Sequence, residues 1–479
     1  MESHYHYRIA AEMAAGDLAP NPGRHLPMGA LGKEHPVDHH WGLHLIITPF
    51  AALGDLLEND GTAMHIASAF FGVASIFGLF LVIRLGGGAL AGFLCLLPLA
   101  FGTILWRLLQ LRGGGLMAVG LLLWAIFAFK KPRPLAAGIT AALLMVSYHG
   151  AFLLLPLSCA ALGAIGLLVP EKGIRIPKDT LLACAASWAG AFLALVVGPY
   201  GVKGLFFLIY HLKTSFGDPA GFYGSNHEFS PFSMDMLLHF PEYLGVFAGA
   251  VALGAYLWRQ REHHTSYTFA MTAMTIALVF LSWRSHRMVE YALPFFAVSL
   301  SQTNWVRNWQ AWPKKSLIHT AFIALLLVGI SRNINETHTI VSTTTTPSNA
   351  YEPTREILQG TPGIIGNLFQ GDFSLILWQH PEARCLQGLN HYFTHHDPEV
   401  GQALETLKAG APDPEMQNST AVLISKGVTL FTQRSRKDGS LRPFGVFAEA
   451  HPELFSLTYG DKNSFCRIWT PKPGQNPRP

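Results

Sequence analysis

Long apolar stretches separated by short polar segments run along the first two thirds of the chain. Runs such as 87–106, 113–129 and 180–200 contain no charged side chain. An α-helix needs about 20 predominantly apolar residues to cross the hydrocarbon core of a bilayer. The pattern therefore predicts an α-helical polytopic membrane protein.

Ten stretches are candidate membrane spans: 63–84, 87–106, 113–130, 134–149, 151–169, 180–200, 241–258, 267–283, 289–304 and 316–331. Ahead of them, residues 45–57 are apolar but interrupted by Pro49. This stretch has only about 13 residues, which predicts an interfacial or re-entrant helix and not a span. Residues 1–331 are thus expected to form a transmembrane domain with external loops at 1–44 and 201–240.

Positive charge alternates between the short loops that join these spans. Lysines and arginines gather at residues 84, 130–133, 172–178, 259–261 and 307–315. By the positive-inside rule these loops are cytoplasmic. The loops at 107–112, 149–150, 201–240 and 284–288 are then extracytoplasmic, together with residues 2–44 and everything after 332. We expect a multi-pass protein of the inner, or cytoplasmic, membrane with its active site and C-terminal domain outside.

From about residue 332 the composition becomes that of a soluble domain. A Thr-rich stretch at 339–349 predicts a linker. The predicted strands are 363–367, 384–388, 421–425 and a hairpin of 455–459 with 465–469, and the predicted helices are 372–378 and 399–409. Alternating strands and helices predict a small α/β domain over 332–479. It has no Gly-rich phosphate loop, nucleophile elbow or zinc spacing, which favours a structural or acceptor-positioning role.

Composition supports the membrane class and argues against a nucleic-acid-binding protein. The 479 residues are 50% hydrophobic and 13% charged, about half the ~25% charge of an ordinary soluble domain. The net charge of +4 comes without a basic stripe, so nucleic acid is not an expected partner. Cys385 and Cys466 fall in the polar C-terminal part, where they can form a disulfide if the compartment is oxidising.

Histidines and carboxylates gather ahead of the hydrophobic body. Seven of the 22 histidines fall within residues 2–44, together with Glu2, Glu34 and Asp38. Imidazoles and carboxylates at short spacing can bind a divalent metal or move protons. A polar, solvated N-terminal arm is the alternative, since histidine runs are common in tails.

Four arginines occupy short outward loops, where the positive-inside rule gives no reason for them: Arg107, Arg112, Arg284 and Arg287. Arginines at span ends can simply snorkel to the membrane surface. A cluster on the histidine-rich side is better explained by an anionic ligand, because the guanidinium suits phosphate. Glu290 follows Arg287 by three residues, close enough for an intrahelical ion pair.

The motif Glu2-Ser3-His4-Tyr5-His6-Tyr7-Arg8, followed by Asp38-His39-His40-Trp41, resembles the first external loop of GT-C glycosyltransferases. The likeness is strongest to the catalytic subunit of oligosaccharyltransferases and allied uncharacterised membrane proteins. In that family an acidic residue opens an acid-x-x-Tyr-His-Tyr-Arg pattern. The resemblance implies that Glu2 and Asp38 ligate a metal or act as a base, and that Tyr5 and Arg8 contact the substrate.

Later segments extend the resemblance. Gly198-Pro199-Tyr200, the 201–240 loop with Glu228 at its centre, and the segment from Arg287 to Pro294 fall where such proteins carry a functional acid and a phosphate-binding arginine. The motif begins at residue 2, where the family has a first transmembrane helix ahead of it, so the given start is expected to be truncated or internal. The first acid is Glu where Asp is usual. The Trp-Trp-Asp motif that reads a sequon is missing, so transfer to asparagine is not expected.

The resemblance implies inverting transfer of a sugar from a polyprenyl-phosphate or pyrophosphate donor, held at the lipid bilayer, to a glycan, lipid or protein acceptor. Glu2 or Asp38 would be the general base, with Glu228 as a further acid. A divalent metal (Mg, Mn or Zn) on Glu2, Asp38, His39 and His40 would neutralise the leaving phosphate, assisted by Arg284 and Arg287.

Two other classes of function stay open. One is a metal-binding membrane transporter, which requires ionisable residues inside the spans. The other is a non-catalytic membrane scaffold whose soluble domain is its working part.

Overall fold

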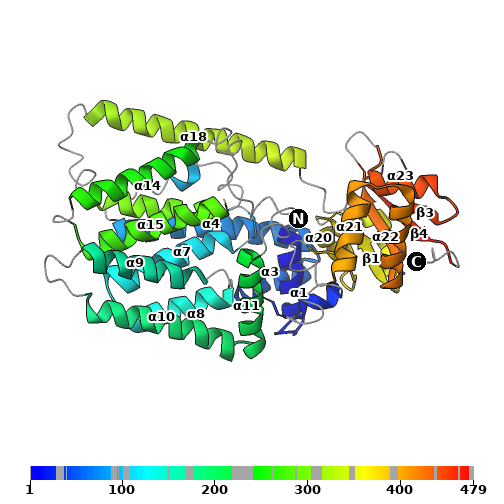
Figure 1. The fold of residues 1–479 in the computed structure, drawn as a ribbon, viewed down its shortest axis with the longest axis horizontal. Helices are drawn as coiled ribbons and strands as arrows, with labels where there is room; N and C mark the ends of the chain where they lie inside the picture. Colours follow the sequence, from blue (N-terminus) through cyan, green and yellow to red (C-terminus); the bar gives the residue numbers. More distant parts are fainter. Residues whose placement is uncertain are drawn as a thin grey trace.

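The molecule is a bundle of long helices with a smaller domain of helices and strands at one end (Figure 1). The computed structural model describes residues 2–27, 37–38, 40–87, 94, 97–100, 108, 110–111, 113–147, 152–168, 176–217, 241–260, 264–285, 288–303, 315–344, 351–369, 371–388, 397–435, 440–461 and 464–473.

The bundle helices follow the predicted spans closely. They are α4 (Asp60–Gly87), α7 (Gly114–Ala125) with a π-helical turn (Ile126–Lys130), α8 (Pro134–Ser147), α9 (Leu154–Leu168), α10 (Lys178–Val197), α14 (Pro241–Arg259), α15 (Ser266–Arg284) and α16 (Val289–Ser301). Of the predicted span at 87–106, the described residues include a short 3-10 turn at Pro98–Ala100. Within the described part of the chain, three helices are long and apolar enough to cross a membrane: Asp60–Gly87, Lys178–Val197 and Ser266–Trp283.

Small residues let two of these helices approach closely. A Cβ placed on Gly190 of α10 would collide with the backbone carbonyl of Gly138 on α8. Such close backbone approach supplies the van der Waals contact that holds helices together where lipid is as apolar as the side chains. The indole of Trp124 on α7 donates to the Ser187 hydroxyl of α10 at 2.9 Å, which satisfies a buried polar group.

Two predicted loops contain helix. The helix α11 (Val202–Gly217) occupies the first part of the expected 201–240 loop, and Glu228 lies outside the described residues. The last predicted span, 316–331, continues as α18 (Lys315–Thr344) into the stretch expected to be a linker. No glycine or proline interrupts 331–346, and the Asn333 amide donates to the Leu99 carbonyl at 2.8 Å.

The histidine-rich stretch is not the polar loop that the sequence predicts. It contains α1 (Glu2–Ala14), a 3-10 turn (Pro22–His25) and the start of α3 (Trp41–Leu57), and most of its described side chains are buried. We call residues 2–27 together with 37–44 the N-terminal segment. Gly54 of α3 allows its close approach, since a Cβ there would strike the Tyr7 hydroxyl. That hydroxyl donates to Asp60 Oδ1 at 3.0 Å.

The C-terminal domain is built on a mixed four-stranded sheet of order β1-β2-β4-β3. Its strands are β1 (Ile364–Asn367), β2 (Val428–Arg434), β3 (Phe455–Tyr459) and β4 (Cys466–Pro471). The β1–β2 pair is parallel, whereas β2–β4 and β3–β4 are antiparallel. The accompanying helices are α19 (Arg355–Gln359), α20 (Asp372–Gln379), α21 (Pro398–Ala409), α22 (Asp413–Ser425) and α23 (Pro443–Ala450).

Two strand predictions in this domain are wrong. Residues 421–425 form the end of α22, because Pro414 near its start and the acidic first turn favour a helix that runs on to Ser425. Gly427, at φ +97°, then turns the chain into β2, a strand that was not predicted from the sequence. Residues 384–388 contribute only one isolated bridge, between Cys385 and Ile365.

The two cysteines that could have formed a disulfide are free thiols in the structure. Cys385 and Cys466 are both buried. Burial, together with the nearby Asp372 carboxylate, raises the pKa of the Cys466 thiol to about 12. Both side chains therefore act as small apolar core residues of the C-terminal domain.

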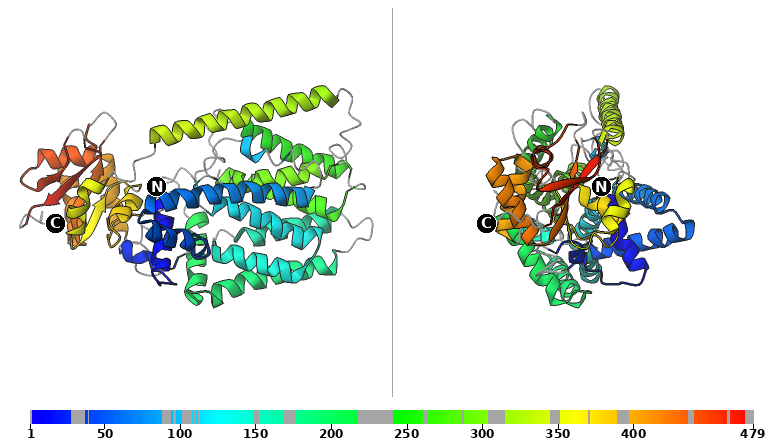
Figure 2. Two further views of the ribbon diagram at one scale, coloured as in Figure 1. Left: turned by 180° about the vertical axis from the view of Figure 1, so that it is seen from behind. Right: turned by 90° about the vertical axis from the view of Figure 1, so that its right-hand side faces the viewer.

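The N-terminal segment lies between the helix bundle and the C-terminal domain (Figure 2). The backbone N–H of Cys385 donates to the His25 carbonyl at 2.7 Å, and the His25 ring nitrogen Nδ1 lies 3.1 Å from the Ala383 carbonyl. The Tyr5 and Phe373 rings are 5.8 Å apart. Residues from the two ends of the chain therefore share one hydrophobic core.

Candidate functional site

Asp38 is a buried carboxylate with two ordered hydrogen bonds. It is 2% exposed and lies just ahead of α3. Its Oδ1 accepts the backbone N–H of His40 at 2.9 Å, an Asx-type turn that leads the chain into the helix. Its Oδ2 lies 2.5 Å from Nδ1 of His44. The carboxylate is thus held from two sides.

Histidines from two helices meet behind this carboxylate. Nε2 of His44, on α3, lies 2.8 Å from Nδ1 of His6, on α1. The His40 and His6 rings stand edge to face at 5.0 Å. His40 thus lies near both Asp38 and His6. The direct contacts of His44 and His6 were not predicted from the sequence. The only sequence signal for them is the density of histidines within residues 2–44.

A buried tyrosine, Tyr5, and a half-buried one, Tyr200, complete the surroundings of Asp38. Tyr5 packs against the rings of His6 and His44. Burial, followed by the charges of Asp38 and Glu12, raises the pKa of Tyr5 well above its ordinary value. Tyr200 donates its hydroxyl proton to the Pro20 carbonyl at 2.8 Å, and burial and Asp38 likewise raise its pKa. Both rings stay neutral at physiological pH.

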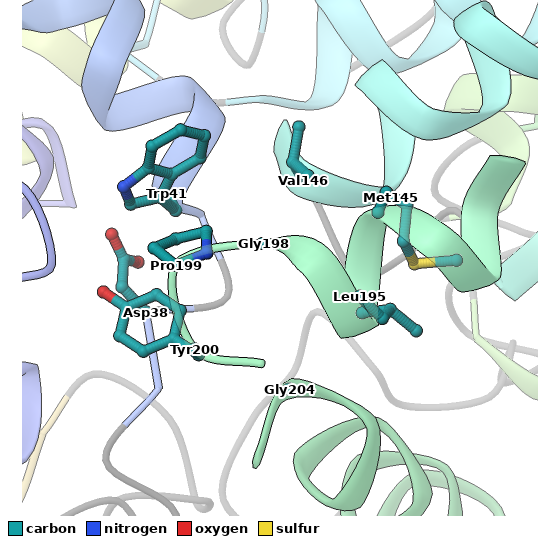
Figure 3. A pocket seen from close by; sticks show the side chains of 10 residues that line it. Asp38, Trp41, Met145, Val146, Leu195, Gly198, Pro199, Tyr200 and Gly204 are labelled. Carbon is teal, nitrogen blue, oxygen red and sulfur yellow. The ribbon is translucent and has the colours of Figure 1, made fainter. Parts of the chain in front are cut away.

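Asp38 lines a small pocket that is partly open to solvent. Figure 3 shows the carboxylate on the same side as the Trp41 and Tyr200 rings, with Met145 and Leu195 opposite. One wall is thus polar and aromatic, and the other is the apolar surface of α8 and α10. The full lining is Asp38, Trp41, Met145, Val146, Ala194, Leu195, Gly198, Pro199, Tyr200 and Gly204. The Gly198-Pro199-Tyr200 turn singled out in the sequence therefore meets Asp38.

Arg8 is a half-buried cation on α1. Its Nε is buried and has no hydrogen-bond partner among the residues that the structure describes. The carboxylate one helical turn further on, Glu12, is bonded instead to Arg24 at 2.7 Å and to His25 at 3.1 Å. Arg8 is thus a cation that a bound anion could satisfy.

The other predicted site residues are located only in part. Glu2 is the first residue of α1 and Arg284 the last of α15, and neither side chain is described. Glu290 is half-buried near the start of α16, with Oε2 3.4 Å from where a Cβ on Gly114 would stand. That places its carboxylate at the positive N-terminal end of α7. Four further predicted residues lie outside the described residues: His39, Arg107, Arg112 and Arg287.

The described side chains do not group into a metal site. Among them, no three or more histidines, cysteines or carboxylates are placed to hold an ion together. Asp38 uses its two oxygens for His40 and His44. The side chains of Glu2 and His39, the remaining members of the expected ligand set, are outside the described part.

No protein-family model matches this sequence, and no curated protein matches it. Its structure is similar to that of ArnT from Cupriavidus metallidurans, solved bound to undecaprenyl phosphate, with a TM-score of 0.52 and 13% identity. The match covers 99% of this chain and 94% of that one. The chain has the GT-C fold. The expected fold class, a polytopic GT-C-like helical protein with a small C-terminal sheet, is thus confirmed.

A second similarity within the GT-C class is to the arabinofuranosyltransferase AftD from Mycobacteria, with a TM-score of 0.49 and 16% identity. That match covers 97% of this chain but 37% of AftD.

Proposed function

We propose that this GT-C protein is a membrane glycosyltransferase that moves a sugar from a polyprenyl-phosphate-linked donor to an acceptor hydroxyl on the extracytoplasmic side. The observation that carries the proposal is Asp38, a buried carboxylate held by hydrogen bonds at a pocket walled by α8 and α10. The similarity to ArnT, whose structure contains undecaprenyl phosphate, supports the class of donor.

The pocket suits an amphiphilic substrate. Its apolar wall, with Met145 and Leu195, belongs to two helices of the bundle and offers the kind of surface that a lipid chain would cover. Its opposite wall offers Asp38 and the rings of Trp41 and Tyr200, which suit the polar and apolar faces of a sugar. A donor in which a phosphate joins a lipid to a sugar likewise has an apolar part and a polar part.

Asp38 is assigned the role of general base. It takes the proton from the acceptor hydroxyl, whose oxygen forms a bond to the anomeric carbon. The bond from that carbon to the phosphate oxygen breaks, and the phosphate leaves with the electron pair. A single displacement of this kind inverts the anomeric configuration.

Arg8 is proposed to interact with the donor phosphate. A half-buried guanidinium whose Nε has no described partner gains most from an anion, and the phosphate gains charge as it leaves. The divalent metal stays a separate prediction, and no step above is routed through it.

The test is turnover of radiolabelled polyprenyl-phosphate sugars by the purified protein and by Asp38→Asn. Loss of a general base should slow transfer by roughly 10²- to 10⁴-fold. Asp413→Asn, which changes a mostly exposed carboxylate of the C-terminal domain, is the matched control and should keep full activity. Full activity of Asp38→Asn would remove Asp38 from the site. Absence of turnover by the wild type with every lipid-phosphate sugar would contradict the proposed function.

A further inference from the structure

Asp38, His44 and His6 form an unbroken line of hydrogen-bonding groups inside the protein. The two contacts measure 2.5 Å and 2.8 Å. His44 is 0% exposed and His6 is 5% exposed, so water does not compete for these contacts. The line joins the stretch ahead of α3, α3 itself and α1.

Asp38 sets the direction of these hydrogen bonds. An ionised carboxylate can only accept, so His44 must carry its proton on Nδ1. Neutral His44 then has a lone pair on Nε2, which accepts the Nδ1–H of His6. Each imidazole is thereby assigned the Nδ1–H tautomer.

We propose that His44 and His6 are positioning residues for the base. His44 holds the Asp38 carboxylate in the orientation that faces the pocket, and His6 holds His44 in the tautomer that can donate. The inference rests on the proposed function, because it assigns these histidines to the same site. It adds two residues, neither of which touches the substrate, to the machinery of transfer.

The physical reason is that a general base works only when one lone pair is aimed at the proton it takes. Asp38 is fixed at Oδ1 by the His40 N–H and at Oδ2 by His44, which stops rotation of the carboxylate. Histidines oriented by a further hydrogen-bonding group recur in active sites for this purpose. Here α1, which is itself fixed by the Tyr7–Asp60 hydrogen bond, supplies that further group.

Two pairs of variants separate positioning from simple packing. Asparagine keeps an N–H donor where Nδ1 stood, whereas alanine removes it. His44→Ala should lower kcat roughly 10- to 100-fold with the donor KM unchanged, and His44→Asn should recover most of the rate. His6→Ala and His6→Asn should follow the same order with smaller losses, because His6 acts through His44.

The control is His25→Asn, a buried histidine of the same N-terminal segment that contacts Ala383 and Glu12 instead of the site. It should lower the thermal unfolding midpoint and leave kcat unchanged. Equal activity of His44→Ala and wild type would overturn the proposal. Activity lost by His44→Ala and His44→Asn alike, in proportion to their loss of stability, would also overturn it.

A readout independent of turnover is the tautomer of each ring. Histidine-selective ¹⁵N spectra of wild type, with signals assigned from the His44→Asn and His6→Asn variants, should show both rings protonated at Nδ1. A His44 ring protonated only at Nε2 would contradict the proposed hydrogen bonds from His44 to Asp38 and from His6 to His44. If the tautomers are as expected and Asp38→Asn remains active, the proposed function fails. If Asp38→Asn is inactive and His44→Ala is fully active, only the positioning role fails.

Discussion

Glu12 is a titratable residue that links the stability of the N-terminal segment to pH. Its buried carboxylate contacts the Arg24 guanidinium at 2.7 Å and the His25 ring at 3.1 Å. Burial alone would raise the pKa of Glu12. The hydrogen bonds and positive charges of His25 and Arg24 outweigh it and hold that pKa below the ordinary value of 4.5.

This shift predicts an acid-sensitive fold. A carboxyl group with a lowered folded-state pKa stabilises the protein above its unfolded pKa and loses that contribution as the pH falls through the folded value. The thermal unfolding midpoint should therefore fall as the pH drops below 4.5. Glu12→Gln should lower the free energy of unfolding by about 1–3 kcal/mol near neutral pH. The decrease of its unfolding midpoint below pH 4.5 should also be smaller than in wild type. If the midpoint of Glu12→Gln decreases with pH as steeply as that of wild type, other carboxyl groups cause the decrease.

Asp38 should also matter for stability, contrary to what a solvated external loop would imply. Alanine at this position leaves the buried Nδ1–H of His44 without its acceptor. An unsatisfied buried donor costs about 1–3 kcal/mol. Asp38→Ala should therefore unfold at lower denaturant concentration than Asp38→Asn, which keeps an acceptor oxygen. Equal stability of the two variants would contradict the buried hydrogen bond.

At the scale of elements, an ion pair joins α20 to β2 within the C-terminal domain. Asp372 is fully buried and lies 2.5 Å from the guanidinium of Arg434, which is mostly buried. That guanidinium also lies over the rings of Phe369 and Phe465, at 4.4 Å and 4.8 Å from their centroids. Burial raises the pKa of Asp372 even against the charge of Arg434. The carboxylate therefore depends on its polar neighbours, Arg434 first among them.

Breaking this pair from the arginine side should be costly. Arg434→Leu leaves a buried carboxylate uncompensated, which typically costs about 3–5 kcal/mol. Adding Asp372→Asn should recover part of that loss, because the remaining group carries no charge. Hydrogen exchange of the full-length protein should report the change as faster exchange in β2 and α20. Unaltered exchange in Arg434→Leu would contradict a structural role for the pair.

Helices and strands could be predicted from the sequence where their own residues carry the hydrophobic pattern, and not where distant contacts determine them. Apolar runs such as those of α4 and α10 are read directly, because the hydrophobic pattern is their cause. The helix α1 was missed because its histidines and tyrosines look solvent-exposed, and only partners far along the chain bury them. The strand β2 was missed because the apolar run before it ends a helix.

The candidate site shows the same division. Asp38 was predicted from a short motif, and the Gly198-Pro199-Tyr200 turn from its place in the chain. The contact between His6 and His44 joins residues 38 positions apart on two helices. Spacing along the sequence carries no signal for such a contact. The pocket wall formed by Met145 and Leu195 likewise depends on how α8 and α10 pack.

At the scale of the whole molecule, the N-terminal segment, α11 and the C-terminal domain lie toward the same end of the bundle (Figure 1). The backbone N–H of Leu111 donates to the Ser3 hydroxyl at 3.2 Å, and the Tyr200 hydroxyl donates to the Pro20 carbonyl. These contacts join the N-terminal segment to residues that precede α7 and follow α10.

The side of the membrane on which this end lies is a prediction of the loop charges. A reporter that works only in the cytoplasm should stay silent when fused after Pro479. The same reporter inserted after Lys131, in a loop expected to be cytoplasmic, should be active and serves as the control. A strong signal from the fusion after Pro479 would reverse the topology and place the pocket on the cytoplasmic side.

The position of the N-terminal segment also bears on how the protein is made. His25 and Ala383 are 358 residues apart, so the ribosome finishes the segment long before it makes the residues that cover it. Contacts of such long range form late, because the connecting chain must first be ordered. Until the C-terminal domain emerges, Tyr5 and His25 lack their covering surface. The segment that contains Tyr5 and His25 is therefore expected to be among the last to reach its native packing, and it exposes apolar surface until then.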